Sequence, residues 1–256
     1  MESSRFSSTH SIHSIAGQPF DRACLKDLVK GIRRTTAKKQ QQARPLVSAD
    51  LKAILAGLGD GPRAARDRLL FALGFAGALR RSELVGLDWL ERGEGDGFVI
   101  RDERGLVITL LRTKGGKGEP ETVIVPCPDM PTACEALAAW ASLANLQPGQ
   151  PVFRNVTKGG EIGADRLTDR SVSLIIKKQA RACAIAAGQS EVEADALADL
   201  CSGHSLRAGY CTAAAMAGTP EWKIRRRSRH RTAELVARYV RAAEDWTDSG
   251  LKGVGF

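Results

Sequence analysis

The fold class depends on the stretch FVIRDERGLVITLLRTKGGKGEPETVIV, which spans Phe98 to Val125. It contains three short runs rich in β-branched and other apolar residues, at 98–100, 106–111 and 122–125, and loops rich in Gly or charge separate them. Such runs between turn residues are typical of short antiparallel strands. We therefore expect a small antiparallel β-sheet in this part of the chain.

The sequence on both sides of this stretch has the periodicity of helices. Before it, Ser48 is expected to cap a helix, residues 64–78 form a nearly apolar helix that should be buried, and a shorter helix starts near Ser82. After it we expect six more helices, at about 131–146, 168–187, 191–200, 205–217, 221–228 and 232–243. The predicted class is mostly α with a small antiparallel β-sheet (α+β).

Composition limits the classes of protein that remain. The chain has 256 residues, and 38 Lys and Arg against 29 Asp and Glu give a formal net charge of +9. The apolar content of 43% is ordinary for a globular protein. We find neither an apolar run long enough to span a membrane nor a secretory signal at the N-terminus. These features favour a soluble cytoplasmic protein.

The six cysteines form no CxxC motif, and no Cys/His cluster has the spacing of a zinc site. We expect all of them to be reduced thiols, mostly buried, in a reducing cytoplasm. The acidic pair Asp195 and Asp199, four residues apart, is better explained as a solvated helix face than as a metal site. We expect neither a metal nor any other cofactor.

The positive charge is concentrated in two clusters. Residues 22–44 hold eight Lys and Arg against one acid, and residues 221–241 hold eight against two. Either cluster alone could be a solvated helix face, but together they indicate a polyanion partner. Aromatic residues are only 5% of the chain, which argues against stacking on single-stranded bases, so duplex DNA is the expected partner. The residues expected to contact DNA are Arg33, Arg34, Lys38, Lys39, Arg225, Arg226, Arg227 and Arg229.

Four short motifs succeed one another along the chain. They are Arg80-Arg81-Ser82-Glu83-Leu84, Arg112-Thr113-Lys114-Gly115-Gly116-Lys117, His204-Ser205-Leu206-Arg207, and His230 with Tyr239 nine residues later. His-x-x-Arg alone is a weak signal. A His nine residues before one of only two tyrosines is much rarer by chance, and the joint order of all four motifs is harder still to dismiss.

This ordered set resembles the catalytic domain of the tyrosine recombinase (phage integrase) family, from about Pro45 to Arg241. The resemblance implies that Arg80, Lys114, His204, Arg207, His230 and Tyr239 are catalytic and that Glu83 supports them. It also implies a site-specific recombinase that integrates or excises a phage or mobile element, through a covalent 3′-phosphotyrosine. Related activities remain open: a type IB-like topoisomerase, or a catalytically inactive DNA-binding remnant.

The chemistry suits these residue types. Two guanidiniums, of Arg80 and Arg207, can clamp the nonbridging oxygens of a phosphate in its transition state. The histidines can donate hydrogen bonds or accept the proton of Tyr239, whose phenol we expect neighbouring cations to acidify. Lys114 can protonate the departing 5′ oxygen. Glu83 would repel phosphate, so it more reasonably orients a histidine or an arginine.

Several alternatives stay open at this stage. Arg80 could merely cap a helix, with Arg81 as the catalytic arginine, and Lys117 could replace Lys114. Tyr210, three residues after Arg207 on the same helix, is expected to be a packing residue. The Gly-rich segment 115–118 lacks the frame of a phosphate-binding loop.

The resemblance also suggests an organisation. We expect a partial, core-binding-like helical region and linker at 1–44, a catalytic domain at 45–245 and a tail at 246–256. A helical domain usually precedes the catalytic part in this family, so the first region is either vestigial or shortened. The expected assembly is a homotetramer on DNA, with possible accessory DNA-bending proteins, the tail docking on a neighbouring subunit, and nucleoid association when DNA is bound.

Overall fold

The structure is a computed structural model that describes residues 27, 43–111 and 119–247, and the side chains up to residue 240. The chain divides into two compact units, residues 1–42 and 43–256. The first unit is described only at residue 27, so the fold below is that of the second. The expected contacts at Arg33, Arg34, Lys38 and Lys39, and the loop lysines Lys114 and Lys117, lie outside the described residues.

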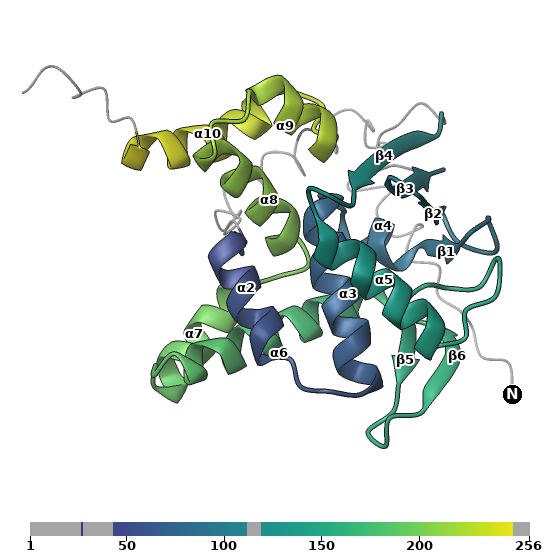
Figure 1. Cartoon of the computed structure of the whole chain (residues 1–256). Coiled ribbons are helices and arrows are strands. Elements are labelled where there is room, and N and C mark those ends of the chain that lie inside the picture. The colour runs from purple at the N-terminus through teal and green to yellow at the C-terminus, as the bar shows by residue number, and fades with distance from the viewer. Residues whose placement is uncertain (1–26, 28–42, 112–118, 248–256) are drawn as a thin grey trace, which may run out of the picture. The chain divides into compact units, whose positions relative to one another are not determined.

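The second unit is mainly helical, which confirms the predicted class (Figure 1). Its helices are α2 (Ser48–Gly57), α3 (Pro62–Ala76), α4 (Arg81–Val85), α5 (Pro131–Leu143), α6 (Asp169–Ala186), α7 (Glu191–Leu200), α8 (Ser205–Met216), α9 (Glu221–Ser228) and α10 (Ala233–Thr247). Ser48 is the first residue of α2 and does not cap it. Instead the N–H of Val47 donates to the carboxylate of Asp50 at 3.0 Å. No described helix is long and apolar enough to cross a membrane.

The β-structure is small, and it is mixed rather than purely antiparallel. Strands β1 (Leu87–Trp89), β2 (Gly97–Asp102), β3 (Gly105–Leu110) and β4 (Glu121–Pro126) lie in that order in one sheet. The antiparallel part, β2-β3-β4, is the predicted one, whereas β1 pairs with β2 in parallel. Strands β5 (Arg154–Val156) and β6 (Ile162–Arg166) form a separate antiparallel pair. The sequence did not reveal these three additional strands because each is too short to show an alternation.

The core surrounds α3, which lies in the middle of the unit and packs against α5 and α8 (Figure 1). Residues 69–76 of α3 are all buried, as their apolar sequence predicts. Trp140 of α5 is the largest fully buried side chain among the residues whose burial is described, and its indole N–H donates to the carbonyl of Val152 at 2.6 Å. The core therefore holds α3 firmly, and the C-terminal end of α3 becomes a fixed platform for the side chains that gather around it.

A buried carboxylate ties the sheet to the second hairpin. Asp88 of β1 is completely buried, and its Oδ2 accepts from the N–H groups of Gly93 and Gly95 at 2.8 and 2.7 Å. Its Oδ1 forms an ion pair with Arg166 of β6, which also donates to the carbonyl of Val85. A buried charge needs such partners, so this network explains how a strand as short as β1 is held.

A smaller cluster fixes the C-terminal helices. Cys211 of α8, Ile224 of α9 and Val236 of α10 are fully buried against one another. Tyr239 and Val240 of α10 pack on this cluster while remaining partly exposed. Tyr239 is thus held on a helix that packs against α8 and α9.

One expectation about the cysteines is wrong. Cys127, just after β4, and Cys134, in the first turns of α5, form a disulfide. The chain reverses between β4 and α5, which brings two residues only seven apart in the sequence to a Cα–Cα distance of 5.8 Å. Among the other described cysteines, Cys183, Cys201 and Cys211 are free thiols, as expected.

Candidate active site

The site is built on the end of α3. The backbone of Ala78 is left-handed (φ 45°), and the turn it makes leaves carbonyl groups at the helix end available as acceptors. Three arginines, from α8, from α9 and from the residue that follows α9, donate to these carbonyls. The pairs are Arg227 with Ala76 O (2.9 Å), Arg229 with Gly77 O (3.1 Å) and Arg207 with Ala78 O (3.0 Å). The C-terminus of a helix carries partial negative charge, so it is a favourable place for cations.

Arg80 and Glu83 are joined across the start of α4. The N–H of Arg80 donates to Glu83 Oε2 at 2.8 Å, and the guanidinium of Arg80 pairs with Glu83 Oε1. The Arg80 guanidinium also donates to the carbonyl of Arg229 at 3.4 Å. The neighbouring Arg81 turns away toward α6, where it contacts Ser173 and Asp169.

Arg229 completes this cluster from the other side. Its guanidinium donates to Glu83 Oε2 at 2.6 Å, and the side chains of Arg229 and Glu83 are only 6% and 4% exposed. Burial by itself would raise the pKa of Glu83, but Arg229 and Arg80 outweigh it, so the pKa lies below its ordinary value. We expected Arg229 to contact DNA, but the structure buries it as the partner of Glu83.

Arg207 of α8 lies beside the same cluster and is 5% exposed. Burial, together with the smaller effect of the charges of Arg80 and Arg229, lowers the pKa of Arg207 to about 10. Its guanidinium therefore remains protonated at neutral pH. Two guanidiniums, of Arg80 and Arg207, thus stand close enough to influence each other, with Glu83 offsetting part of their charge.

His230 and Tyr239 lie next to these arginines. Their ring centroids are 6.0 Å apart and the rings are tilted by 40°. Burial, then the charges of Arg207, Arg80 and Arg229, lowers the pKa of His230 to about 4, so the imidazole is neutral at pH 7.

The environment of Tyr239 differs from our expectation. We expected neighbouring cations to acidify its phenol. Burial instead raises the pKa of Tyr239, and the nearby charges of Arg207 and Arg238 offset this only in part. In the protein without DNA the phenol is therefore protonated at neutral pH.

Ser228 is a contact that sequence analysis missed. Its hydroxyl is fully buried and lies 2.7 Å from Nδ1 of His230. A serine two residues before a histidine is too common a pattern to have indicated this pairing. His204 is exposed at the start of α8, three residues before Arg207, and its N–H donates to Ser202 Oγ at 3.2 Å.

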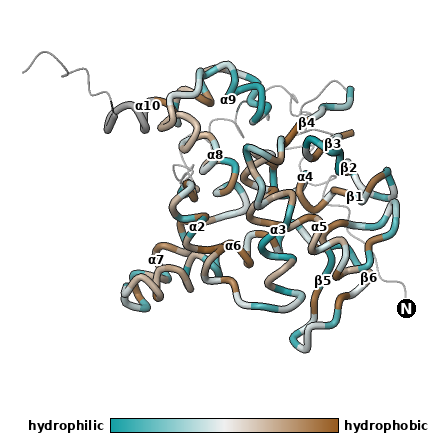
Figure 2. The backbone as a smooth tube through the Cα atoms, viewed as in Figure 1, coloured by the Kyte–Doolittle hydropathy of each residue, from teal (hydrophilic) through white to brown (hydrophobic). Residues whose placement is uncertain are grey.

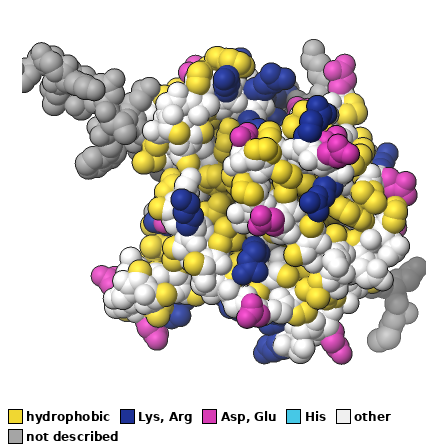
Figure 3. Space-filling model, in the orientation of Figure 1, with side chains coloured by type: hydrophobic (Ala, Val, Ile, Leu, Met, Phe, Trp, Pro, Cys, Tyr) yellow, Lys and Arg dark blue, Asp and Glu magenta, His cyan; other side chains and the backbone are white. Residues whose placement is uncertain are grey.

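The cations of α9 divide into two groups. Arg225 and Arg226 are exposed, and Figure 3 shows dark blue side chains over this helix, which is largely teal in Figure 2. Arg227 is half-buried, with its guanidinium 5.9 Å from the ring of Tyr210. Of the four arginines of this segment that we expected to contact DNA, only these first two are exposed.

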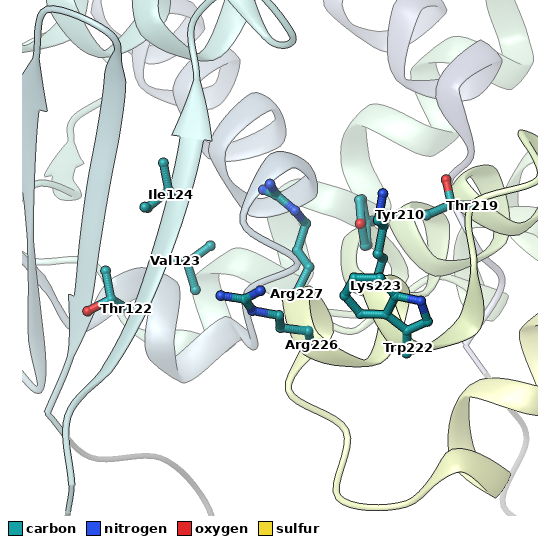
Figure 4. A pocket seen from close by; sticks show the side chains of 9 residues that line it. All are labelled: Thr122, Val123, Ile124, Tyr210, Thr219, Trp222, Lys223, Arg226 and Arg227. Atoms are coloured by element: carbon teal, nitrogen blue, oxygen red, sulfur yellow. The ribbon is translucent and has the colours of Figure 1, made fainter.

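An open pocket of 420 Å³ separates α9 from β4. Figure 4 shows Arg226 and Arg227 extending from α9 into this space, with Thr122, Val123 and Ile124 of β4 opposite. Tyr210 forms one of its walls and also packs edge-on against Phe75 at 6.0 Å. The packing role expected for Tyr210 agrees with this contact.

The acidic residues of α7 form ion pairs at the protein surface, in line with the solvated helix face that the sequence suggests. Asp195 pairs with Arg181, and Asp199 pairs with Lys177 at 2.7 Å. Within the part of the chain that the structure describes, no three His, Cys, Asp or Glu residues gather in a way that could hold a metal ion.

The structure thus brings together five of the seven residues singled out from the sequence. Arg80, Glu83, Arg207, His230 and Tyr239 share one set of contacts and charge interactions. His204 is anchored three residues from Arg207, and Lys114 lies outside the described residues.

Comparisons with known proteins identify the family of the chain. Residues 44–245 match the Phage integrase family. The integrase/recombinase XerD homolog of Selenomonas ruminantium is 31% identical over 232 residues, which cover 89% of this chain and 62% of that protein. The chain therefore spans less than two thirds of the length of this curated relative.

Solved structures show the same fold at low sequence identity. The XerH site-specific recombinase in its post-cleavage complex with palindromic difH substrate has a TM-score of 0.56 and 15% identity, covering 84% of this chain and 54% of that one. The Tn1549 transposon integrase in complex with circular intermediate DNA (TM-score 0.54, 15% identity) covers 91% and 76%. The XerA recombinase (TM-score 0.51, 15% identity) covers 92% and 75%. The match of residues 44–245 to the family model shows that the chain belongs to the phage integrase family, the tyrosine recombinases.

Proposed function

We propose that this chain is a site-specific DNA recombinase that cuts and rejoins duplex DNA to move a phage or another mobile element. The observation that carries the proposal is the convergence of two guanidiniums, a neutral imidazole and a phenol at the end of α3. Those groups come from the residue before α4, from α8, from the α9–α10 turn and from α10, so the fold, and not local sequence, assembles them.

The proposed reaction is a transesterification. The phenol oxygen of Tyr239 attacks the phosphorus of the scissile diester, the bond to the 5′ oxygen breaks, and a 3′-phosphotyrosine forms. Arg80 and Arg207 bind the nonbridging oxygens, whose charge increases in the transition state. Lys114 gives a proton to the departing 5′ oxygen, and His204 donates a hydrogen bond to the phosphate or handles a proton. Because the covalent bond retains the energy of the diester, religation needs no ATP.

Glu83 and Arg229 act indirectly, by holding Arg80. The Glu83 carboxylate accepts from both Arg80 and Arg229, so it fixes the Arg80 guanidinium at the edge of the site. Arg81 points toward α6 instead, which supports Arg80 as the catalytic arginine.

We propose duplex DNA as the partner. The structures of XerH and of the Tn1549 integrase named above are complexes with DNA, and Arg225 and Arg226 offer exposed positive charge on α9. The N-terminal cluster at Arg33, Arg34, Lys38 and Lys39 and the half-buried Arg227 are proposed as further contacts. Assembly as a homotetramer on DNA, a catalytic domain at 45–245 and docking of the tail on a neighbouring subunit remain parts of this proposal.

The direct test traps the covalent intermediate on a nicked suicide substrate. We expect an adduct with the wild-type chain and none with Tyr239→Phe. The matched control is Tyr210→Phe, since Tyr210 is the other tyrosine of the chain and packs against Phe75. An adduct that survives Tyr239→Phe would contradict the assignment, and no adduct on any attachment-site DNA would favour an inactive DNA-binding protein. Strand exchange between two duplexes, rather than relaxation of one plasmid, separates a recombinase from a type IB-like topoisomerase.

A further inference from the structure

Arg229 is held in a backbone conformation that glycine would adopt more easily. It ends α9 with φ 54° and ψ 41°, in the left-handed region, where a residue with a Cβ atom is strained. In this conformation its carbonyl oxygen accepts from the guanidinium of Arg80 at 3.4 Å. Strain of this kind persists only where the surrounding structure holds the residue in place, and it gathers at functional sites. The contacts of the Arg229 side chain therefore need an explanation.

The guanidinium of Arg229 is bonded on all sides within the protein. Among the described residues its two terminal nitrogens make four hydrogen bonds, to the carbonyls of Arg227 (2.9 Å), Gly77 (3.1 Å) and Ala78 (3.3 Å) and to Oε2 of Glu83 (2.6 Å). The third nitrogen, Nε, is buried and lies 3.5 Å from Oε2 of Glu121. Because the side chain is only 6% exposed, this cation acts inside the protein.

Arg80 has the opposite character. Among the same described residues its guanidinium donates to Glu83 and to the carbonyl of Arg229, and its side chain is 18% exposed. A guanidinium has five N–H groups, so Arg80 keeps donors for the oxygens of a phosphate. The contacts therefore suit Arg80 to binding phosphate and Arg229 to an internal role.

Arg229 contacts the partners of both arginines that are proposed to bind the phosphate. It shares the carboxylate of Glu83 with Arg80. It shares the carbonyl oxygen of Ala78 with Arg207, at 3.3 and 3.0 Å. Cations that share an acceptor have their separation limited by it, so Arg229 limits the positions of both neighbours. Without Arg229, Glu83 Oε2 would also be open to the Arg80 guanidinium, which could then turn away from the phosphate.

We propose that Arg229 is a positioning residue that sets the spacing and orientation of the Arg80 and Arg207 guanidiniums and does not itself contact DNA. The inference rests on the proposed function, since this spacing matters for binding two nonbridging oxygens of one scissile phosphate. It goes beyond the contact of Arg80 with Glu83, because it assigns the alignment of both arginines to one side chain. Donors that act on a transition state must be placed to within about 0.5 Å.

The informative variant is Arg229→Gly, because glycine adopts the left-handed backbone freely and only the side chain is lost. On the suicide substrate at saturating DNA, under single-turnover conditions, we expect adduct formation to slow by about tenfold to a hundredfold, the effect of misplacing catalytic groups by about 1 Å. The DNA Kd should change by less than about twofold. Arg229→Lys keeps the charge but not the planar set of donors, so it should recover only part of the rate. A wild-type rate in folded Arg229→Gly would overturn the proposal.

The matched control is Arg66→Ala, which removes another buried arginine. Arg66 lies near the start of α3 and pairs with Asp67 at 2.7 Å, and both side chains are 8% exposed. Its loss should lower the thermal stability and leave the rate at saturating DNA unchanged. If Arg66→Ala and Arg229→Gly slow adduct formation equally, Arg229 has only a structural role and the proposal is wrong.

A double-mutant cycle tests whether Arg229 acts through Arg207. If it does, the combined variant of Arg229→Gly and Arg207→Ala should be faster by at least about threefold than the product of the two separate losses predicts, because one guanidinium of the aligned pair is already absent. A rate equal to that product would contradict the proposal.

A measurement on the wild-type chain does not depend on how the variants fold. In NMR spectra of the full chain labelled with ¹⁵N-Arg, we expect the guanidinium Nε–H of Arg229 to exchange with water at least about tenfold more slowly than that of Arg80. Equal or faster exchange at Arg229 would overturn the inference. The two proposals also fail differently. A wild-type chain that forms no adduct contradicts the proposed function, whereas an adduct formed at the same rate by wild type and Arg229→Gly contradicts only the role of Arg229.

Discussion

Replacing Glu83 by Gln keeps the shape of the side chain and removes the charge that holds the site together. The carboxylate accepts from the guanidiniums of Arg80 and Arg229 and from the N–H of Arg80, and it is 4% exposed. The amide of Gln still has one oxygen, but its NH₂ group would face a guanidinium that can only donate. One charge-assisted hydrogen bond is lost, and Arg80, Arg207 and Arg229 then repel one another with only the partly exposed Glu121 left near Arg229.

We expect Glu83→Gln to reduce the free energy of unfolding by about 3 kcal/mol, since a charged hydrogen bond contributes about 1.5–3 kcal/mol and breaking a buried ion pair costs about 3–5 kcal/mol. The matched control is Glu121→Gln. Glu121 also approaches Arg229, but at 3.5 Å and with a side chain that is 39% exposed, so its loss should cost below about 0.5 kcal/mol. Urea unfolding at pH 7 measures both. A change below about 1 kcal/mol for Glu83→Gln, or equal changes for the two variants, would refute the reasoning.

The pH dependence of this difference gives an independent check of sign. The arginines keep the pKa of Glu83 in the folded protein below its ordinary value of 4.5, although burial opposes them. The unfolded chain therefore binds the proton first as the pH falls, and the stabilisation is complete above about pH 4.5 and is lost below it. The gap in stability between wild type and Glu83→Gln should be constant from pH 6 to 8 and shrink below pH 4.5. A gap that widens on acidification would contradict the assigned ion pairs.

Three further predictions use the same geometry. Arg207→Ala should slow adduct formation by about 10²–10³-fold while DNA Kd rises at most about threefold, because its guanidinium acts mainly on the transition state; equal losses in rate and binding would argue against that role. Arg226→Ala should reduce the slope of log K against log salt by about 0.9, as one phosphate contact is removed, whereas Arg181→Ala, an exposed arginine paired with acids of α7, should leave the slope unchanged. Burial and its neighbouring arginines lower the pKa of His230 from 6.5 to about 4, so the unfolded state binds the proton first as the pH falls. The free energy of unfolding should therefore decrease as the pH is lowered from 6.5 to 4, and His230→Gln should lack this contribution. An identical pH dependence in wild type and His230→Gln would count against the neutral imidazole.

Periodicity was sufficient for most of the secondary structure. The apolar run at 69–76 predicts a buried helix and is buried, and the β-branched runs at 98–100, 106–111 and 122–125 predict three strands that the structure contains. The strands at 87–89 and 154–156 were not predictable in this way. Asp88 lies in the middle of the first of these strands, and Arg154 is the first residue of the second. The burial of these two charges depends on partners outside their own strands.

The candidate site shows the same division between local and long-range information. The spacing of His230 and Tyr239 is local, and the two rings do lie together. The burial of Arg229 depends on a long-range contact, because its guanidinium pairs with Glu83, 146 residues away. Its charge in a basic run suggested a DNA contact, and only the fold shows that its guanidinium points inward. The disulfide between Cys127 and Cys134 likewise depends on the turn between β4 and α5.

The most direct test of the central claim identifies the residue that becomes attached to DNA. The chain contains two tyrosines, and trypsin separates them, because Tyr210 lies in the peptide 208–223 and Tyr239 begins the peptide 239–241. After adduct trapping and nuclease digestion, mass spectrometry should find the nucleotide on the peptide 239–241, since its tyrosine lies beside His230 and Arg207. A nucleotide on the peptide 208–223, or on a residue other than tyrosine, would contradict the account.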